Sequence, residues 1–263
     1  MAKKHDIIWI DRVDSTNNEA KRRLSDYDNL SVLSALEQTE GRGQRGNSWT
    51  NPPGENLMFS IVLKFTLDAR DQFILTEIAS LSVVDFLSRH GISAMIKWPN
   101  DIYVGEKKIC GILIENSIRG KYISSSIIGI GLNINQRNFD VNIPNPTSMV
   151  LCRPDSAAQC GPLDLHGSLE EFMDIFISYH DKYLSAGSDL PRLRQLYLER
   201  LWLRDQPSRF VDYTVLHSDI TPDSGREFHG IIRGLSELGH LIVEDLTCDS
   251  LREYGFKEIG YIL

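Results

Sequence analysis

The sequence predicts an α+β fold, in which a mixed β-sheet flanked by helices spans residues 1–204 and a small β-barrel spans residues 205–263. Two patterns lead to this prediction. Helix-like and strand-like segments alternate up to about residue 204, whereas only period-2 alternation is found after Pro207. The length of 263 residues fits one medium-sized domain with a small second one.

The first domain should begin with a strand at residues 7–10. Thr16 and Glu19 have the spacing of a capping box, which predicts a helix over residues 17–24. Apolar residues recur at helical spacing between Asp71 and His90, and Gly91 follows as a C-cap. Further strands are expected at 32–38, 57–65, 94–98, 101–104, 108–115 and 122–134, and helices at 169–184 and 190–203. Residues 137–167 show no periodicity and are expected to be irregular.

The second domain should consist of strands alone. Period-2 patterns over residues 210–216, 228–235, 240–245 and 254–262 predict four short strands.

Composition excludes several classes of protein. A net charge of −8 gives little gain from counterion release, so binding to DNA is not expected. No Cys-x-x-Cys or His-Glu-x-x-His spacing suggests a structural metal. No apolar run has the length of a signal or membrane segment, so we expect a cytoplasmic protein without a membrane partner.

The segment Gly41-Arg42-Gly43-Gln44-Arg45-Gly46-Asn47-Ser48-Trp49 is a cationic loop rich in glycine. Glycines allow the backbone to approach a ligand closely, and arginines suit a phosphate. It is not a P-loop, because no Gly-Lys-Ser/Thr follows. An ordinary solvated surface loop is the alternative. Trp49 favours a ligand site, because an aromatic ring beside such a loop can form a stacking wall.

The segment Lys97-Trp98-Pro99-Asn100-Asp101 places a turn and a carboxylate at a strand end. Asp101 can lie near a phosphate or its magnesium ion, although a turn in which Asn100 and Asp101 satisfy the backbone explains the pattern as well. Period-2 counting puts Lys108 on the face of Cys110, which predicts a lysine on the buried side of the sheet that needs an anion.

Three glycines, Gly111, Gly129 and Gly131, fall inside or at the ends of predicted strands. Glycine weakens a strand, so several together indicate a ligand lying against bare backbone. A β-bulge or tight packing is the alternative for each one singly. Together, the loop, the lysine, the carboxylate and the glycines predict one site.

These segments resemble the biotin–protein ligase family. The elements that carry the resemblance are Asp14-Ser15-Thr16-Asn17, Gly41-Arg42-Gly43 with Arg45, Gly46 and Trp49, Lys97 to Asp101, Lys108, Gly111 to Glu115, and Gly129 to Asn135. The resemblance implies a class II synthetase-like catalytic domain and an SH3-like C-terminal barrel. It also implies that biotin and ATP, with Mg²⁺, form biotinyl-5′-adenylate, and that biotin then passes to a lysine of a biotin carboxyl carrier domain.

The resemblance assigns roles to individual residues. Lys108 and Arg42 are expected to be catalytic, and Asp101 is a candidate metal ligand and a candidate base for the acceptor amine. The expected biotin-binding residues are Ser15, Thr16, Asn17, Gln38, Gly41, Arg42, Gly43, Gln44, Lys108, Gly111 and Gly129. The expected ATP-binding residues are Arg42, Arg45, Trp49, Asn100, Asp101 and Asn133.

This chain also departs from the family. Gln44 and Asn47 stand where many members have arginine, which predicts weaker phosphate binding and looser retention of the adenylate. The first motif begins close to Met1, so we expect a monofunctional ligase without a DNA-binding domain. A homodimer is possible by the same resemblance. A lipoate or octanoate ligase of the same fold and a catalytically inactive homologue are the alternatives.

Overall fold

The computed structural model describes residues 5–43, 49, 51–153, 161–185, 187–214 and 225–262. The predicted site residues Gln44 and Arg45, and the end of the strand predicted at 210–216, lie outside these ranges.

Seven strands form one large mixed sheet. In spatial order they are β1 (Ile7–Val13), β2 (Val32–Gln38), β3 (Leu57–Asp68), β7 (Tyr122–Leu132), β6 (Lys107–Arg119), β5 (Asp101–Val104) and β4 (Met95–Lys97). The β1–β2 pair is parallel, and the other neighbouring pairs are antiparallel. The predicted mixed sheet is therefore confirmed.

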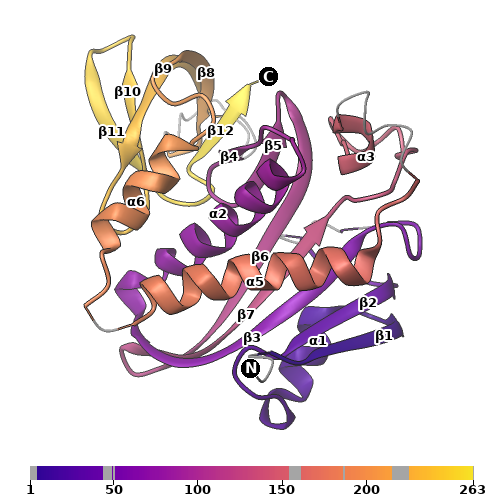
Figure 1. Ribbon diagram of the computed structural model, residues 1–263. Helices are drawn as coiled ribbons and strands as arrows, with labels where there is room; N and C mark the ends of the chain where they lie inside the picture. Colours follow the sequence, from indigo (N-terminus) through magenta and orange to yellow (C-terminus); the bar gives the residue numbers. More distant parts are fainter. Residues whose placement is uncertain are drawn as a thin grey trace.

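Helices cover both faces of this sheet. Figure 1 shows α2 (Phe73–Arg89) and α5 (Leu165–Tyr183) across one face, and α1 (Thr16–Arg22) lies on the other. Neighbouring residues alternate between the two faces, as the strand period requires. Ile61 and Ile128 belong to the large core under α2 and α5, whereas Val62 and Ile127 join Ala20 of α1 in a small second cluster.

The C-terminal part is an antiparallel sheet. Its strands are β8 (Pro207–Asp212), β9 (Arg226–Leu235), β10 (Leu241–Asp245), β11 (Ser250–Tyr254) and β12 (Ile259–Ile262), in the order β11-β10-β9-β8-β12. The single strand predicted over 254–262 is wrong. The chain turns between Gly255 and Glu258, where Glu258 Oε2 accepts from the Gly255 N–H at 2.6 Å and Lys257 has a φ of 80°.

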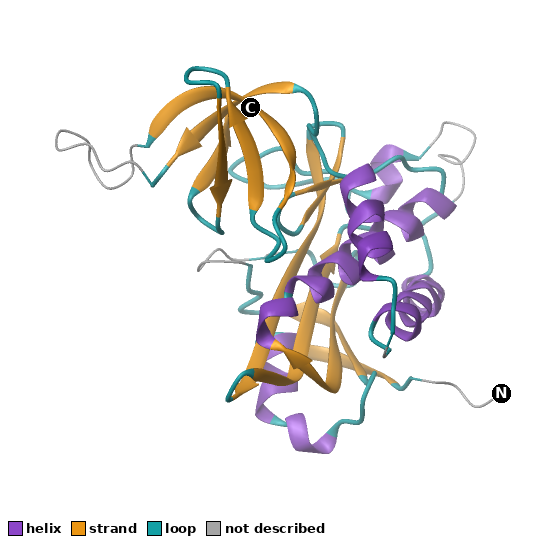
Figure 2. Ribbon diagram, turned by 90° about the vertical axis from the view of Figure 1, so that its left-hand side faces the viewer, coloured by secondary structure: helices purple, strands orange, loops and turns teal. Residues whose placement is uncertain are grey.

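The two sheets share one hydrophobic core. Figure 2 shows the C-terminal sheet as strands next to the helices of the first part of the chain. Phe210 and Ile232 of this sheet belong to the same cluster as α2 and α5, and Trp98 Nε1 donates to Gly239 O at 2.9 Å. The domain division at residues 204/205 stays a prediction. The helix predicted at 190–203 is shorter: α6 (Leu190–Glu199) ends early because Trp202 N donates to Ile96 O beside β4.

Two predicted helix starts also change. α1 begins at Thr16, with Ser15 as N-cap, and no capping box forms because Thr16 Oγ1 lies 3.2 Å from Gln38 Oε1 instead. α5 begins at Leu165, because Asp164 accepts hydrogen bonds from the first-turn backbone. The excursion over 137–167 also contains a short helix, α3 (Met149–Cys152), and 3₁₀ turns occur at Leu24–Asp26 and Ala69–Asp71.

No helix within the described ranges combines the length and the apolarity that crossing a bilayer demands.

A buried ion pair ties α2 to the C-terminal sheet. Arg194 of α6 donates to Glu77 of α2 and to the Ser236 carbonyl, and the Glu77 side chain is only 2% exposed. Burial raises the pKa of Glu77 to about 7, against the opposing effect of Arg194.

We predict that Arg194→Ala destabilises the fold by about 3–5 kcal/mol, because Glu77 is left buried without its cation. The loss should be larger at pH 8 than at pH 5. Without Arg194 the folded-state pKa of Glu77 rises further above its unfolded value. The carboxyl is therefore protonated at low pH without penalty, and stability is lost as pH rises through the folded pKa. Urea unfolding at both pH values measures this.

The double variant Glu77→Gln/Arg194→Ala is the control, because its neutral amide should remove the pH-dependent part of the loss. An equal deficit for Arg194→Ala at pH 5 and pH 8 would contradict this interpretation.

Candidate active site

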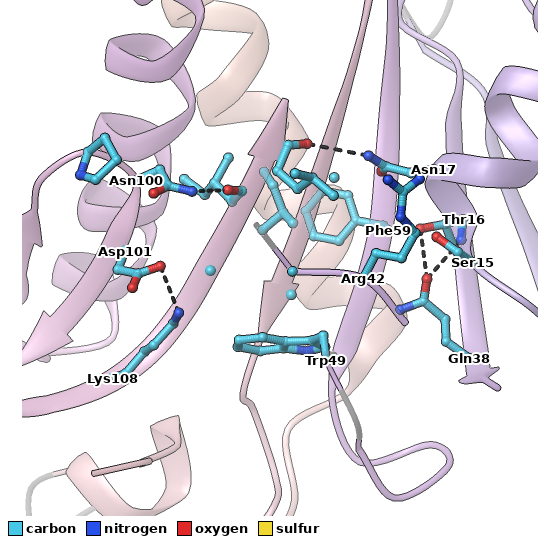
Figure 3. Close-up of a pocket in the computed structure, with 18 of the residues that line it drawn as sticks. Ser15, Thr16, Asn17, Gln38, Arg42, Trp49, Phe59, Asn100, Asp101 and Lys108 are labelled. Atoms are coloured by element: carbon cyan, nitrogen blue, oxygen red, sulfur yellow. Dashed lines mark hydrogen bonds and ion pairs between the residues drawn. The ribbon is translucent and has the colours of Figure 1, made fainter. Parts of the chain in front are cut away.

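A cavity of about 250 Å³ lies on the α1 face of the large sheet, between the sheet and β12. Figure 3 shows Lys108 and Asp101 on one side, Arg42, Asn17, Thr16 and Gln38 on the other, and Trp49 between them. Twelve of the predicted site residues line it: Ser15, Thr16, Asn17, Gln38, Arg42, Gly43, Trp49, Asn100, Asp101, Lys108, Gly111 and Gly129.

Glycines make the floor of the cavity flat. Gly111 of β6 and Gly131 of β7 are directly paired, and a side chain on Gly131 would collide with the indole of Trp49. Gly129, two residues earlier on β7, lies under Asn17: a Cβ there would come within 3.0 Å of Asn17 Oδ1. The floor is therefore open because these strand positions carry no side chain.

Polar groups form a connected chain along one wall. Gln38 Oε1 accepts from the Thr16 N–H at 2.8 Å. Ser60, which pairs with Gly129 across β3 and β7, has its Oγ 2.7 Å from Thr16 Oγ1 and 2.6 Å from Asn17 Oδ1. Ser60 has one hydroxyl proton, so it donates to one of these at a time. The wall thus presents polar groups of fixed orientation, which suit a ligand with a polar ring.

The opposite wall carries an ion pair. Lys108 Nζ lies 2.7 Å from Asp101 Oδ1 and 5.6 Å from the centre of the Trp49 ring, and both ionic side chains are about one-third exposed (30% and 29%). The predicted face of Lys108 is wrong. Ile102 pairs with Cys110 and Tyr103 with Lys108, so Ile109 is an extra residue. This bulge turns Lys108 away from the face of Cys110 and places it beside Gly111.

A segment of the irregular excursion braces this lysine. Lys108 N donates to Asn145 O at 2.7 Å, and Thr147 N donates to Lys108 O at 2.9 Å. Asn133 supports the same segment, because its Nδ2 donates to Thr147 O at 2.9 Å. Asn133 is buried and does not line the cavity, and its predicted role at the nucleotide stays a prediction.

Arg42 enters from the other side. Its Nη1 donates to Asn18 Oδ1 at 2.8 Å and lies 3.4 Å from Glu115 Oε1, and its side chain is 45% exposed. Gly41 does not line the cavity, but it fixes Trp49: Trp49 N donates to Gly41 O at 2.8 Å, and a Cβ on Gly41 would collide with Trp49 O.

The terminal strand β12 closes the cavity with Ile259 and Tyr261. Lys97 attaches this strand to the sheet. Its Nζ lies 3.1 Å from Tyr103 Oη and 4.7, 5.6 and 4.9 Å from the ring centres of Tyr103, Trp202 and Tyr261. Burial lowers the pKa of Lys97, and Asp101 opposes that shift. The contacts of Lys97 with Trp202 and Tyr261 could not be predicted, because these two residues come from distant segments.

Nine of the lining residues have no individual binding role predicted from the sequence. They are Phe59, Trp98, Pro99, Ile112, Leu113, Ile130, Gly131, Ile259 and Tyr261. Gly131 carried a signal as a glycine within a strand, and Trp98 and Pro99 belong to a motif that was recognised. The aliphatic residues look like ordinary core positions in the sequence, so nothing local marks them.

The described residues contain no group of three or more His, Cys, Asp or Glu side chains arranged to hold a metal. Asp101 is the sole carboxylate among the described lining residues, and its Oδ1 already contacts Lys108. These residues therefore do not form a metal site by themselves, and the predicted role of Asp101 toward Mg²⁺ stays a prediction.

The site can hold a molecule with a polar ring at one end and an anion in the middle. The polar wall around Thr16 and Asn17 suits the ring, while Lys108 and Arg42 approach from opposite sides with positive charge. The fold and this site define a protein with a sheet-floored pocket for a polar, anionic small molecule.

Residues 9–133 match the model of the biotin/lipoate A/B protein ligase family. Two curated relatives are biotin–[acetyl-CoA-carboxylase] ligase of Paracoccus denitrificans and chloroplastic biotin–protein ligase 1 of Arabidopsis thaliana. The first is 29% identical over 88% of this chain and 91% of its own length. The second is 28% identical over 90% of this chain, which spans 61% of that relative.

The fold agrees with these matches. Biotin protein ligase from Aquifex aeolicus, solved with biotin and ATP, superposes with a TM-score of 0.74 over 97% of both chains at 24% identity. The chain thus contains a domain of the biotin/lipoate A/B protein ligase family, over residues 9–133.

We predict that Gly129→Ala destabilises the fold by about 1–3 kcal/mol, because the new methyl group displaces Asn17 from Ser60. Chemical denaturation measures the loss. The double variant Asn17→Ala/Gly129→Ala should recover part of it relative to the sum of the single changes, because the space is then free. Gly234→Ala on β9, where nothing lies within 4 Å of the added carbon, is the control; an equal loss there would refute the steric explanation.

Proposed function

We propose that this protein attaches biotin to one lysine of a biotin carboxyl carrier domain, by way of biotinyl-5′-adenylate. The observation that carries the proposal is the placement of Lys108 and Arg42 on opposite sides of a glycine floor, next to a wall of oriented polar groups. The names of the relatives support biotin as the acid.

The first step joins two anions. An oxygen of the biotin carboxylate attacks the α-phosphorus of ATP, an O–P bond forms, and pyrophosphate leaves. Lys108 and Arg42 offset the repulsion between the anions and stabilise the charge that grows on the phosphate oxygens. The polar wall of Thr16, Asn17 and Gln38 orients the ureido ring, so that the carboxylate points to the cations.

The glycine floor and Trp49 determine where the nucleotide lies. Trp49 rests over Gly111 and Gly131 and offers a ring face for stacking with adenine. Asn100 donates its Nδ2 to the Ile112 carbonyl, which fixes the turn that carries Asp101. Mg²⁺ would reach the site with the phosphates of ATP; no step here is assigned to it.

In the second step the acceptor amine attacks the acyl carbon, and AMP leaves. The attacking amine must be neutral. Asp101 Oδ2 is the oxygen that remains when Oδ1 binds Lys108, and we propose that it receives the proton. The carrier domain, homodimer formation and a cytoplasmic location remain predictions within this proposal.

Two alternatives remain. The family includes lipoate ligases, so family membership alone does not select the acid. An inactive homologue would keep the cavity without the chemistry. Mass spectrometry of the protein incubated with ATP, Mg²⁺ and biotin, lipoate or octanoate separates them. We expect the mixed anhydride with biotin; an anhydride with lipoate or octanoate alone, or none at all, would refute the proposal.

Lys108→Ala should reduce biotin-dependent ATP–pyrophosphate exchange by several orders of magnitude, because the cation between carboxylate and phosphate is lost. The fold should persist, since the side chain is partly exposed. Lys107→Ala changes the preceding, exposed lysine and should behave like the unmodified protein. Near-normal exchange in Lys108→Ala would rule out the role assigned to this lysine.

A further inference from the structure

We propose that Glu115 is a positioning residue of this site, which holds Arg42 and Asn17 on one carboxylate and thereby determines how firmly the acyl-adenylate is retained. The inference rests on the proposed function. Glu115 is the last residue of the Gly111–Glu115 motif, and the resemblance assigns it no role.

The Glu115 carboxylate contacts two lining residues that are predicted to bind different parts of the ligand. Glu115 Oε2 accepts from Asn17 Nδ2 at 3.0 Å, and Glu115 Oε1 lies 3.4 Å from Arg42 Nη1. Asn18 Oδ1 binds the same Nη1 at 2.8 Å. The guanidinium is therefore fixed through one nitrogen by an acid on β6 and an amide on α1.

The described residues leave the other two guanidinium nitrogens of Arg42 for a ligand. Among the described residues, Nη2 and Nε of Arg42 have no hydrogen-bond partner. Two donors of a planar fork match two oxygens of a carboxylate or phosphate. A side chain already held in its binding rotamer loses less freedom when the ligand arrives, so the anion is bound more firmly.

Glu115 is placed to support Arg42 rather than to compete with its ligand. Its side chain is only 21% exposed and does not line the cavity. A competing carboxylate would face the cavity and take both terminal nitrogens, whereas this one approaches Nη1 alone and has its other oxygen on Asn17.

The same carboxylate also fixes the ring-binding wall. Asn17 Nδ2 donates to Glu115 and to the Leu113 carbonyl at 3.4 Å, which leaves Asn17 Oδ1 to face Ser60. One acid thus couples the orientation of the amide that meets biotin with that of the cation that meets the adenylate.

Glu115→Gln tests the proposal with little change in shape. A glutamine has one acceptor oxygen and one donor amide, so it satisfies Asn17 or Arg42 but not both. Each protein forms adenylate in a single turnover, and the rate at which the adenylate is released into solution is then measured. The proteins compared are the unmodified protein, Glu115→Gln, Arg42→Ala and the double variant. We expect release about tenfold faster in Glu115→Gln.

If Glu115 acts through Arg42, the double variant should release adenylate no faster than Arg42→Ala alone. The proposal would be overturned if the rate increases of the two single variants multiplied in the double variant. It would also be overturned if Glu115→Gln released adenylate no faster than the unmodified protein. Should Glu115→Gln fail to fold, Glu115→Asp, which keeps the charge but withdraws it, enters the same cycle with the same two criteria.

Lys21→Ala is the matched control. Lys21 Nζ lies 3.8 Å from Glu115 Oε1, but its side chain is 68% exposed, and neither Lys21 nor Glu115 lines the cavity. Its release rate should be unchanged; an increase equal to that of Glu115→Gln would mean that retention does not depend on the contacts of Glu115 with Arg42 and Asn17, and would overturn the proposal. Absence of adenylate from the unmodified protein would instead refute the proposed function.

Discussion

The site depends on strand positions that have no side chain. Gly111, Gly129 and Gly131 lie on the sheet face opposite the large core, where any Cβ would meet Trp49 or Asn17. Three features of the cavity follow from this. The indole can lie flat and a ligand can touch backbone because Gly111 of β6 is paired with Gly131 of β7. The Asn17 amide can reach Ser60 because Gly129, the partner of Ser60 on β7, has no side chain.

Stability and binding are separated by the two faces of one sheet. The face under α2 and α5 packs the main core, which extends without interruption into the C-terminal sheet. The face toward α1 has only the small cluster around Ala20, and beyond it the polar wall and the cations begin. Charged groups that would be costly within the core are therefore tolerated here, since they stay partly exposed and paired.

Most of the fold and much of the cavity could be predicted from the sequence, because the signals are local. Apolar runs mark the strands of the mixed sheet, and cationic loop, turn and glycines mark lining residues. The sheet face on which Lys108 lies could not be predicted, because the bulge at Ile109 depends on the register of β6 against β5. The same holds for the hydrogen bond of Asn133 to Thr147, which lies in an excursion without periodicity, and for the contact of Tyr261 with Lys97, which are far apart in the sequence.

The contribution of β12 to the cavity has a consequence for how the two sheets work together. Ile259 and Tyr261 belong to the C-terminal sheet, whereas the glycine floor belongs to the large sheet. A shift of the C-terminal sheet against the shared core would therefore change the shape of the pocket even if every residue of its floor stayed in place.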